Sequence, residues 1–363
     1  MAYTNIDDPS AFFQSVLYAG DSSNSTVITN TGNSDLQPDW VWIKSRNEGS
    51  AGNGGHMWFD SSRGIKSTTG SDSPFLVSNS TSGDQTNANG LQAIGSDSFT
   101  PGSMTRTNES GDNYVAWQWK CNGGTTATNN DGNRTTTVQA NTTAGFSIVT
   151  YLSNGSAANQ TLGHGLGVAP DVIISKRRGG TTDWLVYHKS LGVGSIIYLN
   201  STSASSTSSP PYKDTPTSTV FSTQNQFQAT DNFVSYCFAE KQGFSNFGKY
   251  YGNGNADGPF VYTGFAPAFV MVKDTSQATN WEMFDVKRNP FNVRNLKLGA
   301  NSSAAENGSD LGNTSQNNID ILSNGFKMKT GNTDTNVSGD TYIYMAFAEN
   351  PFVTSTGIPT TAR

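Results

Sequence analysis

The feature that most constrains the fold of this chain is a set of three short runs that recurs three times in the same order. The first run opens with a proline and closes with a lysine six residues later, reading PDWVWIK from Pro38, PDVIISK from Pro170 and PAFVMVK from Pro267. The second run is aromatic, and its copies HMWFD, WLVYH and WEMFD begin at residues 56, 184 and 281. The third run closes each unit as YVAWQW, FVSYCF and YIYMAF, from residues 114, 233 and 342. Ordered self-similarity of this kind is typical of tandem repeats, so one fold must serve three units.

Each run has the composition of a β-strand, with β-branched and aromatic residues between Gly, Asn and Pro. A further strand-like run precedes each proline, at residues 15–20, 148–151 and 249–252. Nothing long has helical periodicity. Hydrophobic residues make up only 34% of the chain, but 11% is aromatic, which supplies enough buried area for a folded chain rather than a disordered one. We therefore predict an all-β protein of three tandem β-sandwich modules, of the jelly-roll or concanavalin-like type.

The joints between the units follow from composition. We predict an N-terminal arm over 1–13, sandwich repeats over 14–121, 145–243 and 244–353, and a C-terminal tail over 354–363. Residues 122–144 have almost no apolar content and are expected to form a polar, extended linker. The arm is expected to serve as a docking segment.

The stretch GHGLGVAPDVIISK, from Gly163 to Lys176, resembles a phosphate-binding loop at first sight. Such a loop needs glycines between a strand and a helix, so that backbone N–H groups point at the anion. Here the glycines lead into an apolar β-branched run, and they do not recur before Pro38 or Pro267. The stretch is therefore interpreted as a turn that enters a strand, and no cofactor is predicted.

Two columns of polar residues recur with the strands, each column taking the same position in all three units. Lys44, Lys176 and Lys273 close the first run of each unit, and we expect them to be solvated strand ends that discourage edge pairing. Asp60, His188 and Asp285 close the second run. A catalytic acid at that position would need a partner of matched pKa, and the spacing indicates none, so hydrogen-bonded strand ends are favoured.

Metal and catalytic motifs are not apparent. The histidines His56, His164 and His188 are not at metal-ligand spacing, and the two cysteines, Cys121 and Cys237, are too few for a disulfide scaffold. The NDG and NADG segments at 130–132 and 255–258 fit turns better than calcium loops. A glycosidase needs only two suitably placed carboxylates, which sequence alone does not exclude. We predict no catalytic, metal or cofactor residues and expect a protein that is not an enzyme.

The net charge and the aromatic residues in predicted loops indicate which partners to expect. The net charge of −6 without a basic stripe argues against nucleic acid, and no apolar run is long enough to insert in a membrane. The beginning MAYTNIDDPSAFF lacks the pattern of a secretory signal. Tyr212 and Phe291 lie in predicted loops rather than strands, and we predict them as contacts for a glycan or a partner protein.

Three segments also carry a family resemblance: MAYTNIDDPSAFFQSVLYAG, GHGLGVAPDVIISKRRGGTTDWLVYHKSLG and DNFVSYCFAEKQGF. They resemble repeated modules in tail-fibre-like and structural proteins of marine bacteriophages, notably those that infect cyanobacteria and SAR11-type bacteria. Those modules are similar to concanavalin-like or laminin-G-like β-sandwiches. The resemblance implies a virion protein made in the host cytoplasm, with other virion proteins and a host-surface glycan or protein as partners, and with a homotrimer as a candidate assembly.

The function expected from these observations is non-enzymatic host attachment by a tail fibre or tail-associated adhesin. The alternative is a capsid decoration or head-fibre protein that stabilises the virion. A polysaccharide depolymerase is the weaker third hypothesis, since no acidic motif supports it.

Overall fold

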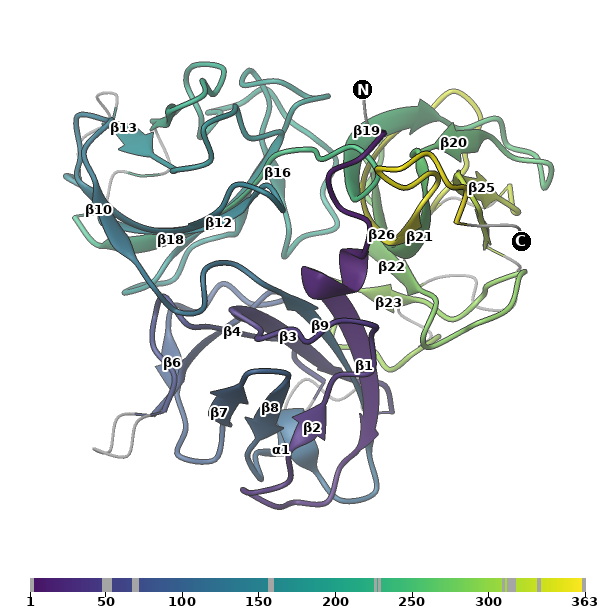
Figure 1. The fold of residues 1–363 in the computed structure, drawn as a ribbon. Helices are drawn as coiled ribbons and strands as arrows, with labels where there is room; N and C mark the ends of the chain where they lie inside the picture. The colour runs from purple at the N-terminus through teal and green to yellow at the C-terminus, as the bar shows by residue number, and fades with distance from the viewer. Residues whose placement is uncertain are drawn as a thin grey trace.

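The computed structural model describes residues 3–47, 54–66, 72–155, 160–224, 227, 230–308, 311, 318–331 and 334–360. Within these residues the chain is nearly all β, with a 3-10 turn η1 (Pro9–Ala11) and one short helix α1 (Thr105–Asn108). The strands form three lobes, each with one large antiparallel sheet and one small one (Figure 1). No helix in the described part of the chain has the length and hydropathy to span a membrane.

Lobe 1 contains a six-stranded and a three-stranded sheet. In spatial order, the large sheet consists of β1 (Phe13–Ala19), β9 (Asn113–Trp119), β3 (Trp40–Ser45), β4 (Met57–Asp60), β5 (Pro74–Val77) and β6 (Gln85–Thr86). The small sheet consists of β2 (Ile28–Thr29), β8 (Ser98–Pro101) and β7 (Leu91–Gly95).

Lobes 2 and 3 repeat this plan. The large sheet of lobe 2 consists of β10 (Ala127–Asn129), β11 (Thr136–Asn141), β12 (Phe146–Leu152), β18 (Asn232–Phe238), β14 (Val172–Arg177), β15 (Leu185–His188) and β16 (Ile197–Tyr198), and its small sheet of β13 (Gln160–Gly163) and β17 (Val220–Thr223). The large sheet of lobe 3 consists of β19 (Ser245–Tyr251), β26 (Thr341–Pro351), β21 (Phe265–Asp274), β22 (Trp281–Asp285) and β23 (Leu298–Gly299), and its small sheet of β20 (Phe260–Tyr262), β25 (Gly325–Met328) and β24 (Ile319–Leu322).

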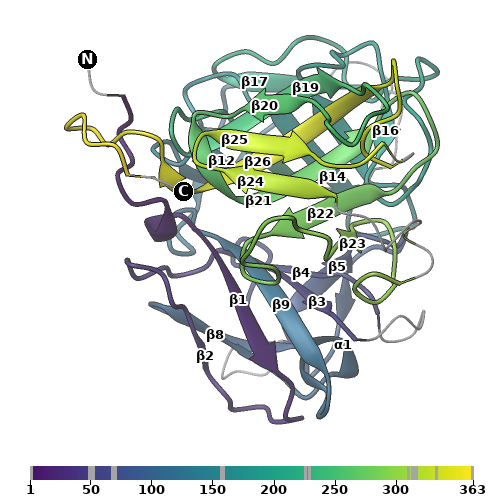
Figure 2. The ribbon, with the colours of Figure 1, turned by 90° about the vertical axis from the view of Figure 1, so that its right-hand side faces the viewer.

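The sequence repeats occupy the same places in the three sheets. The proline-to-lysine run forms β3, β14 and β21, each between the strand of the third run and the strand of the second. The register also recurs, pairing Trp40 with Asp60, Val172 with His188 and Phe269 with Asp285. In each lobe buried apolar residues lie between the large sheet and the small one. Figure 2 shows the small sheet of lobe 3, with β20, β25 and β24, laid over its large sheet. The prediction of an all-β sandwich fold is confirmed.

The three large sheets face one another and share a single aromatic core (Figure 1). Trp40 of lobe 1 stacks on its neighbour Trp119 at 4.1 Å and lies 5.0 Å from Tyr236 of lobe 2, between ring centroids. Phe347 of lobe 3 lies 5.3 Å from Phe13 of lobe 1 and 5.8 Å from Phe238 of lobe 2. The lobes are therefore not independent modules. They pack against one another around a common core and form a closed ring of three lobes.

Hydrogen bonds close every junction of the ring. The indole N–H of Trp184 in lobe 2 donates to the Val77 carbonyl of lobe 1 at 3.0 Å, and that of Trp281 in lobe 3 donates to Tyr198 of lobe 2 at 2.9 Å. The third junction has no covalent link along the chain. There the Ser78 hydroxyl of lobe 1 donates to the Ala300 carbonyl of lobe 3 at 2.7 Å.

The segment expected to be an extended linker, 122–144, forms β10 and β11. Its residues Thr137 to Asn141 pair with β12 and extend the large sheet of lobe 2. A polar composition did not prevent this, because an edge strand needs only main-chain hydrogen bonds and one partly buried face. The expected docking arm is also packed into the fold within its described part. Ile6 lies in the central core, and the Thr4 hydroxyl donates to the Gln242 carbonyl at 2.8 Å.

The prediction that the recurring lysines are solvated is wrong. Lys44, Lys176 and Lys273 are all fully buried. The ammonium of Lys176 donates to the carbonyls of Thr182 in its own lobe at 2.6 Å and Thr81 of lobe 1 at 2.7 Å. Burial lowers the pKa of Lys176 and of Lys273 to about 8, because it penalises the charged form. Lys176 and Lys273 thus end their strands against a neighbouring lobe rather than in water, which sequence spacing does not reveal.

The column of Asp60, His188 and Asp285 is hydrogen-bonded, as predicted, and it too joins the lobes. Asp60 accepts from the Tyr236 hydroxyl of lobe 2 at 2.6 Å, and Asp285 accepts from the indole of Trp117 in lobe 1 at 3.2 Å. Ion pairs add to two junctions. They link Arg63 and Arg178 through Asp84, and Arg288 and Arg46 through Glu306.

Replacing a junction lysine by an apolar residue of similar length should destabilise the ring. We expect Lys176→Met to lower the free energy of unfolding by about 1–3 kcal/mol, because buried carbonyls lose their donor. The matched control Lys213→Met, on an exposed lysine, should change it by less than about 0.5 kcal/mol. Urea denaturation followed by tryptophan fluorescence measures both, and equal stability of the two variants would contradict the role of Lys176.

Candidate binding site

The two loop aromatics predicted as partner contacts have opposite environments. Tyr212 is 1% exposed and lies in the core of lobe 2, where its hydroxyl donates to the Ser175 hydroxyl at 2.8 Å. The polar loop that carries it folds back over β14 and β17, so its ring fills the sandwich instead of facing solvent. The prediction of Tyr212 as a contact residue is therefore corrected. Phe291 is 79% exposed and remains the candidate.

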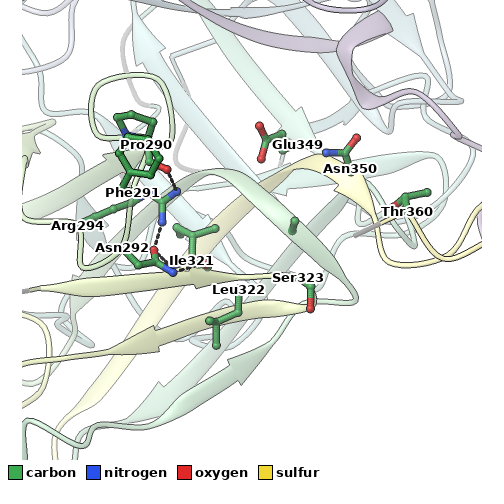
Figure 3. Close-up of a pocket in the computed structure, with 11 residues that line it drawn as sticks. Pro290, Phe291, Asn292, Arg294, Ile321, Leu322, Ser323, Glu349, Asn350 and Thr360 are labelled. Carbon is green, nitrogen blue, oxygen red and sulfur yellow. Dashed lines mark hydrogen bonds between the residues drawn. The ribbon is translucent and has the colours of Figure 1, made fainter. Parts of the chain in front are cut away.

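The loop that displays Phe291 is held from both sides. The Asn292 side chain pairs with the backbone of Ile321 on β24, donating to its carbonyl at 2.8 Å and accepting from its N–H at 3.0 Å. The buried Arg294 donates to the Pro290 carbonyl at 3.0 Å and also to the Asn292 side chain. Figure 3 shows this network below the Phe291 ring. An aromatic ring on a fixed loop loses little conformational entropy when it binds a ligand.

Phe291 borders a groove with a volume of ≈ 710 Å³ on lobe 3. Its lining comes from the loop at 290–294, the turn between β24 and β25, the end of β26 and Thr360 of the C-terminal tail (Figure 3). The side chains that line it are a mixture of apolar groups, amides, hydroxyls and two charged groups: Ala266, Pro290, Phe291, Asn292, Arg294, Ile321, Leu322, Ser323, Glu349, Asn350 and Thr360. Its size lies within the range of ligand pockets, roughly 300–1,000 Å³.

The groove places one exposed aromatic ring beside hydrogen-bonding groups. One exposed ring offers a flat face, and the amides and hydroxyls around it offer hydrogen bonds in both directions. A sugar presents the complementary surfaces, with C–H groups on its ring face and hydroxyls on its edge. Glu349 is the one carboxylate among the residues that line the groove, whereas glycoside hydrolysis ordinarily uses two.

Two carboxylates share one ammonium inside lobe 3. Lys297 lies 3.3 Å from Glu282 and 3.0 Å from Asp334, and the side chains of Lys297 and Glu282 are fully buried. Burial raises the pKa of Glu282 to about 8, although Lys297 opposes the shift. One ammonium cannot neutralise two carboxylates in a low dielectric, so one carboxyl keeps its proton. The equivalent positions of the other lobes hold Met57 and Leu185, so this cluster is particular to lobe 3.

The described residues contain no group of three His, Cys, Asp or Glu side chains that could hold a metal ion. The two histidines of the second run are buried, and each has one ring nitrogen within hydrogen-bond distance of a partner. His56 Nδ1 accepts from the Trp42 indole at 2.8 Å, and His188 Nε2 lies 3.1 Å from the Tyr344 carbonyl of lobe 3. Burial lowers the pKa of His188 to about 4, so its ring is neutral at physiological pH.

Sequence reasoning singled out Phe291, which the structure shows to be exposed, but not the residues around it. Asn292 and Arg294 follow Phe291 directly, yet their partners lie about thirty residues away on β24 or in the bend of the loop. Glu349 and Asn350 continue the third run, which the repeat predicts only as a strand. The one signal available was that Phe291 has no counterpart in the recurring runs.

Asn292 should hold the loop against β24. We expect Asn292→Ala to lower the free energy of unfolding by about 1–3 kcal/mol and to raise amide hydrogen exchange at Ile321 at least tenfold, since that N–H loses its acceptor. Asn350→Ala, on the opposite wall of the groove, is the matched control and should leave exchange at Ile321 unchanged. Identical exchange in the two variants would show that Asn292 does not fix the loop.

The buried cluster should make stability fall with rising pH. The pKa of Glu282 is raised from 4.5 when unfolded to about 8 when folded, so the stabilisation it contributes is complete below pH 4.5 and is lost as pH rises through 8. Glu282→Gln removes this titration, and its stability relative to the wild type should increase steadily from pH 5 to pH 9. Thermal unfolding across that range measures the difference, and a constant difference would contradict the proton assignment.

Comparison with known proteins identifies the family to which the chain belongs. A family model described as a domain of unknown function (DUF7483) matches residues 8–351. No curated protein matches the chain. Among solved structures, the flagellar hook junction protein FlgK from Burkholderia pseudomallei is similar at 13% identity with a TM-score of 0.10, over 66% of this chain and 45% of that one. The chain thus spans less than half of that protein, and a likeness this weak says nothing about fold or function. The match over nearly the whole length shows that the chain belongs to the DUF7483 family.

Proposed function

We propose that this protein is a non-enzymatic virion surface protein, a tail-fibre or tail-associated adhesin that attaches to the host through the groove of lobe 3. The observation that carries the proposal is Phe291, 79% exposed on a loop fixed by Asn292 and Arg294 beside a polar groove. The ligand class that fits this combination of ring and polar groups is a surface glycan. The phage origin rests on the sequence resemblance alone.

Three features support attachment over a purely structural role. A phenylalanine left in water forgoes roughly 1.5–3 kcal/mol of burial free energy, which is recovered when a ligand covers it. The loop is preorganised, so little of that gain is lost to ordering. A weak contact at the groove suffices, because several copies on one virion would multiply it into firm attachment.

The rest of the surface would meet other virion proteins in this proposal. The homotrimer expected from the resemblance stays a prediction, and one chain already supplies three lobes around a common core. The alternative of a capsid decoration protein differs in location, so immunogold labelling of intact virions separates the two. Gold on the capsid shell instead of the tail would overturn the adhesin assignment.

The contact itself is tested by Phe291→Ala in a binding assay with purified fluorescent protein and intact host cells. We expect at least a tenfold loss of affinity, with unchanged thermal stability, because the exposed ring contributes no packing to the core. Tyr251→Ala is the matched control, since Tyr251 is 58% exposed on β19 and does not line the groove. Equal binding by both variants would remove Phe291 from the attachment site.

A further inference from the structure

The groove beside Phe291 continues past lobe 3 to lobe 1. A second cavity of ≈ 270 Å³ lies at the junction of these lobes, and Glu349 and Asn350 line both cavities. The segment after β22 forms a common wall, with Val286 and Lys287 along the second cavity and Pro290 to Asn292 along the first. Because the two cavities share Glu349 and Asn350 and are bordered by the same segment after β22, we treat them as one elongated trough.

The lobe 1 wall of this trough is built as firmly as the Phe291 loop. The Gln14 side chain donates to the carbonyls of Ser10 at 2.9 Å and Ser34 at 2.8 Å, and it accepts from the Gly32 N–H at 2.7 Å. These bonds fix the turn at 31–34, which places the exposed Asn33 on the rim of the second cavity. The two ends of the trough therefore come from different lobes and are each held in place before any ligand arrives.

The chemistry of the trough favours a neutral ligand. Lys287 at the lobe 1 end and Glu349 in the middle balance each other in charge, and the guanidinium of Arg294 is turned into its own loop. Between them lie amides, hydroxyls and the small side chains Ala268 and Ala348. Apolar side chains also line the trough, among them Phe13 and Val286 at the lobe 1 end and Ile321 and Leu322 at the other. Phe13 is buried, whereas Phe291 is exposed at the opposite end.

We infer that the trough binds a linear, neutral oligosaccharide that lies across the junction of lobes 3 and 1, with one sugar on Phe291 and the following units along Glu349, Asn350 and Asn33. This rests on the proposed function, since it specifies the ligand of the same site. A glycan recognised only by its terminal sugar would need the Phe291 end alone. A linear chain uses both ends, so affinity must grow with the number of sugar units.

The test uses isothermal titration calorimetry with three neutral ladders, laminari-, malto- and chito-oligosaccharides of two to six units. For the full chain we expect affinity in at least one ladder to rise at least tenfold from the disaccharide to the hexasaccharide. Asn33→Trp, which fills the lobe 1 end, should abolish this gain and leave disaccharide binding unchanged. Lys287→Ala, at the same end, should reduce the gain by a smaller factor. Asp35→Trp, two residues along and outside the trough, is the control and should keep the gain.

The outcomes separate the two proposals. Equal affinity for short and long members overturns the inference and leaves the Phe291 site standing. A length-dependent gain that survives in Asn33→Trp and Lys287→Ala overturns the assignment of the path to lobe 1. If Phe291→Ala binds oligosaccharides of every length as tightly as the wild type does, the proposed site at Phe291 is wrong. If none of the ladders binds, both the glycan function and this inference fall.

Discussion

Each large sheet in this protein has an apolar inner face that its own small sheet does not cover, and the three faces can only be buried against one another. The aromatic side chains Trp40, Tyr236 and Phe347 meet at that centre from three different lobes. Burial of aromatic surface is the largest favourable term such a chain can gather, because its charged and aliphatic content is low. The polar junctions follow from it: once the sheets converge, strand ends such as Lys176 and Asp60 are enclosed and must find partners in the adjacent lobe.

The repeat made most of the local structure predictable. The proline-to-lysine run predicts a central strand in each lobe, and the recurring register of Trp40, Val172 and Phe269 with the second run bears this out. What surrounds a strand end could not be predicted, because it belongs to another repeat. Lys176 has the spacing of an exposed lysine, but the Thr81 loop of lobe 1 and Thr182 of its own lobe enclose it. The prediction for Tyr212 failed for a similar reason within a single lobe. The polar loop that carries Tyr212 folds back and buries its ring in the sandwich.

The repeated and the unrepeated parts of the chain contribute differently to the candidate site. The recurring strands supply a rigid platform, and the segments that differ between lobes supply the groove: the loop at 290–294, the tail around Thr360 and the turn at 31–34. Binding residues on loops that a rigid scaffold positions are a general pattern. Here the scaffold also fixes the distance between the two ends of the trough, because they stand on lobes that are locked together by the shared core.

The junction between lobes 3 and 1, which no covalent link closes, has a consequence for biosynthesis. Lobe 1 leaves the ribosome first. The part of its inner face around Trp117, which packs on Phe269 of lobe 3, has no partner until lobe 3 has been made more than a hundred residues later. During that interval the nascent chain carries an exposed aromatic surface of the kind that chaperones recognise and that aggregates in their absence. A chain released early, without its last third, would keep that surface permanently. The risk of aggregation is therefore greatest during translation, before the three lobes have closed into a ring, and not in the mature protein.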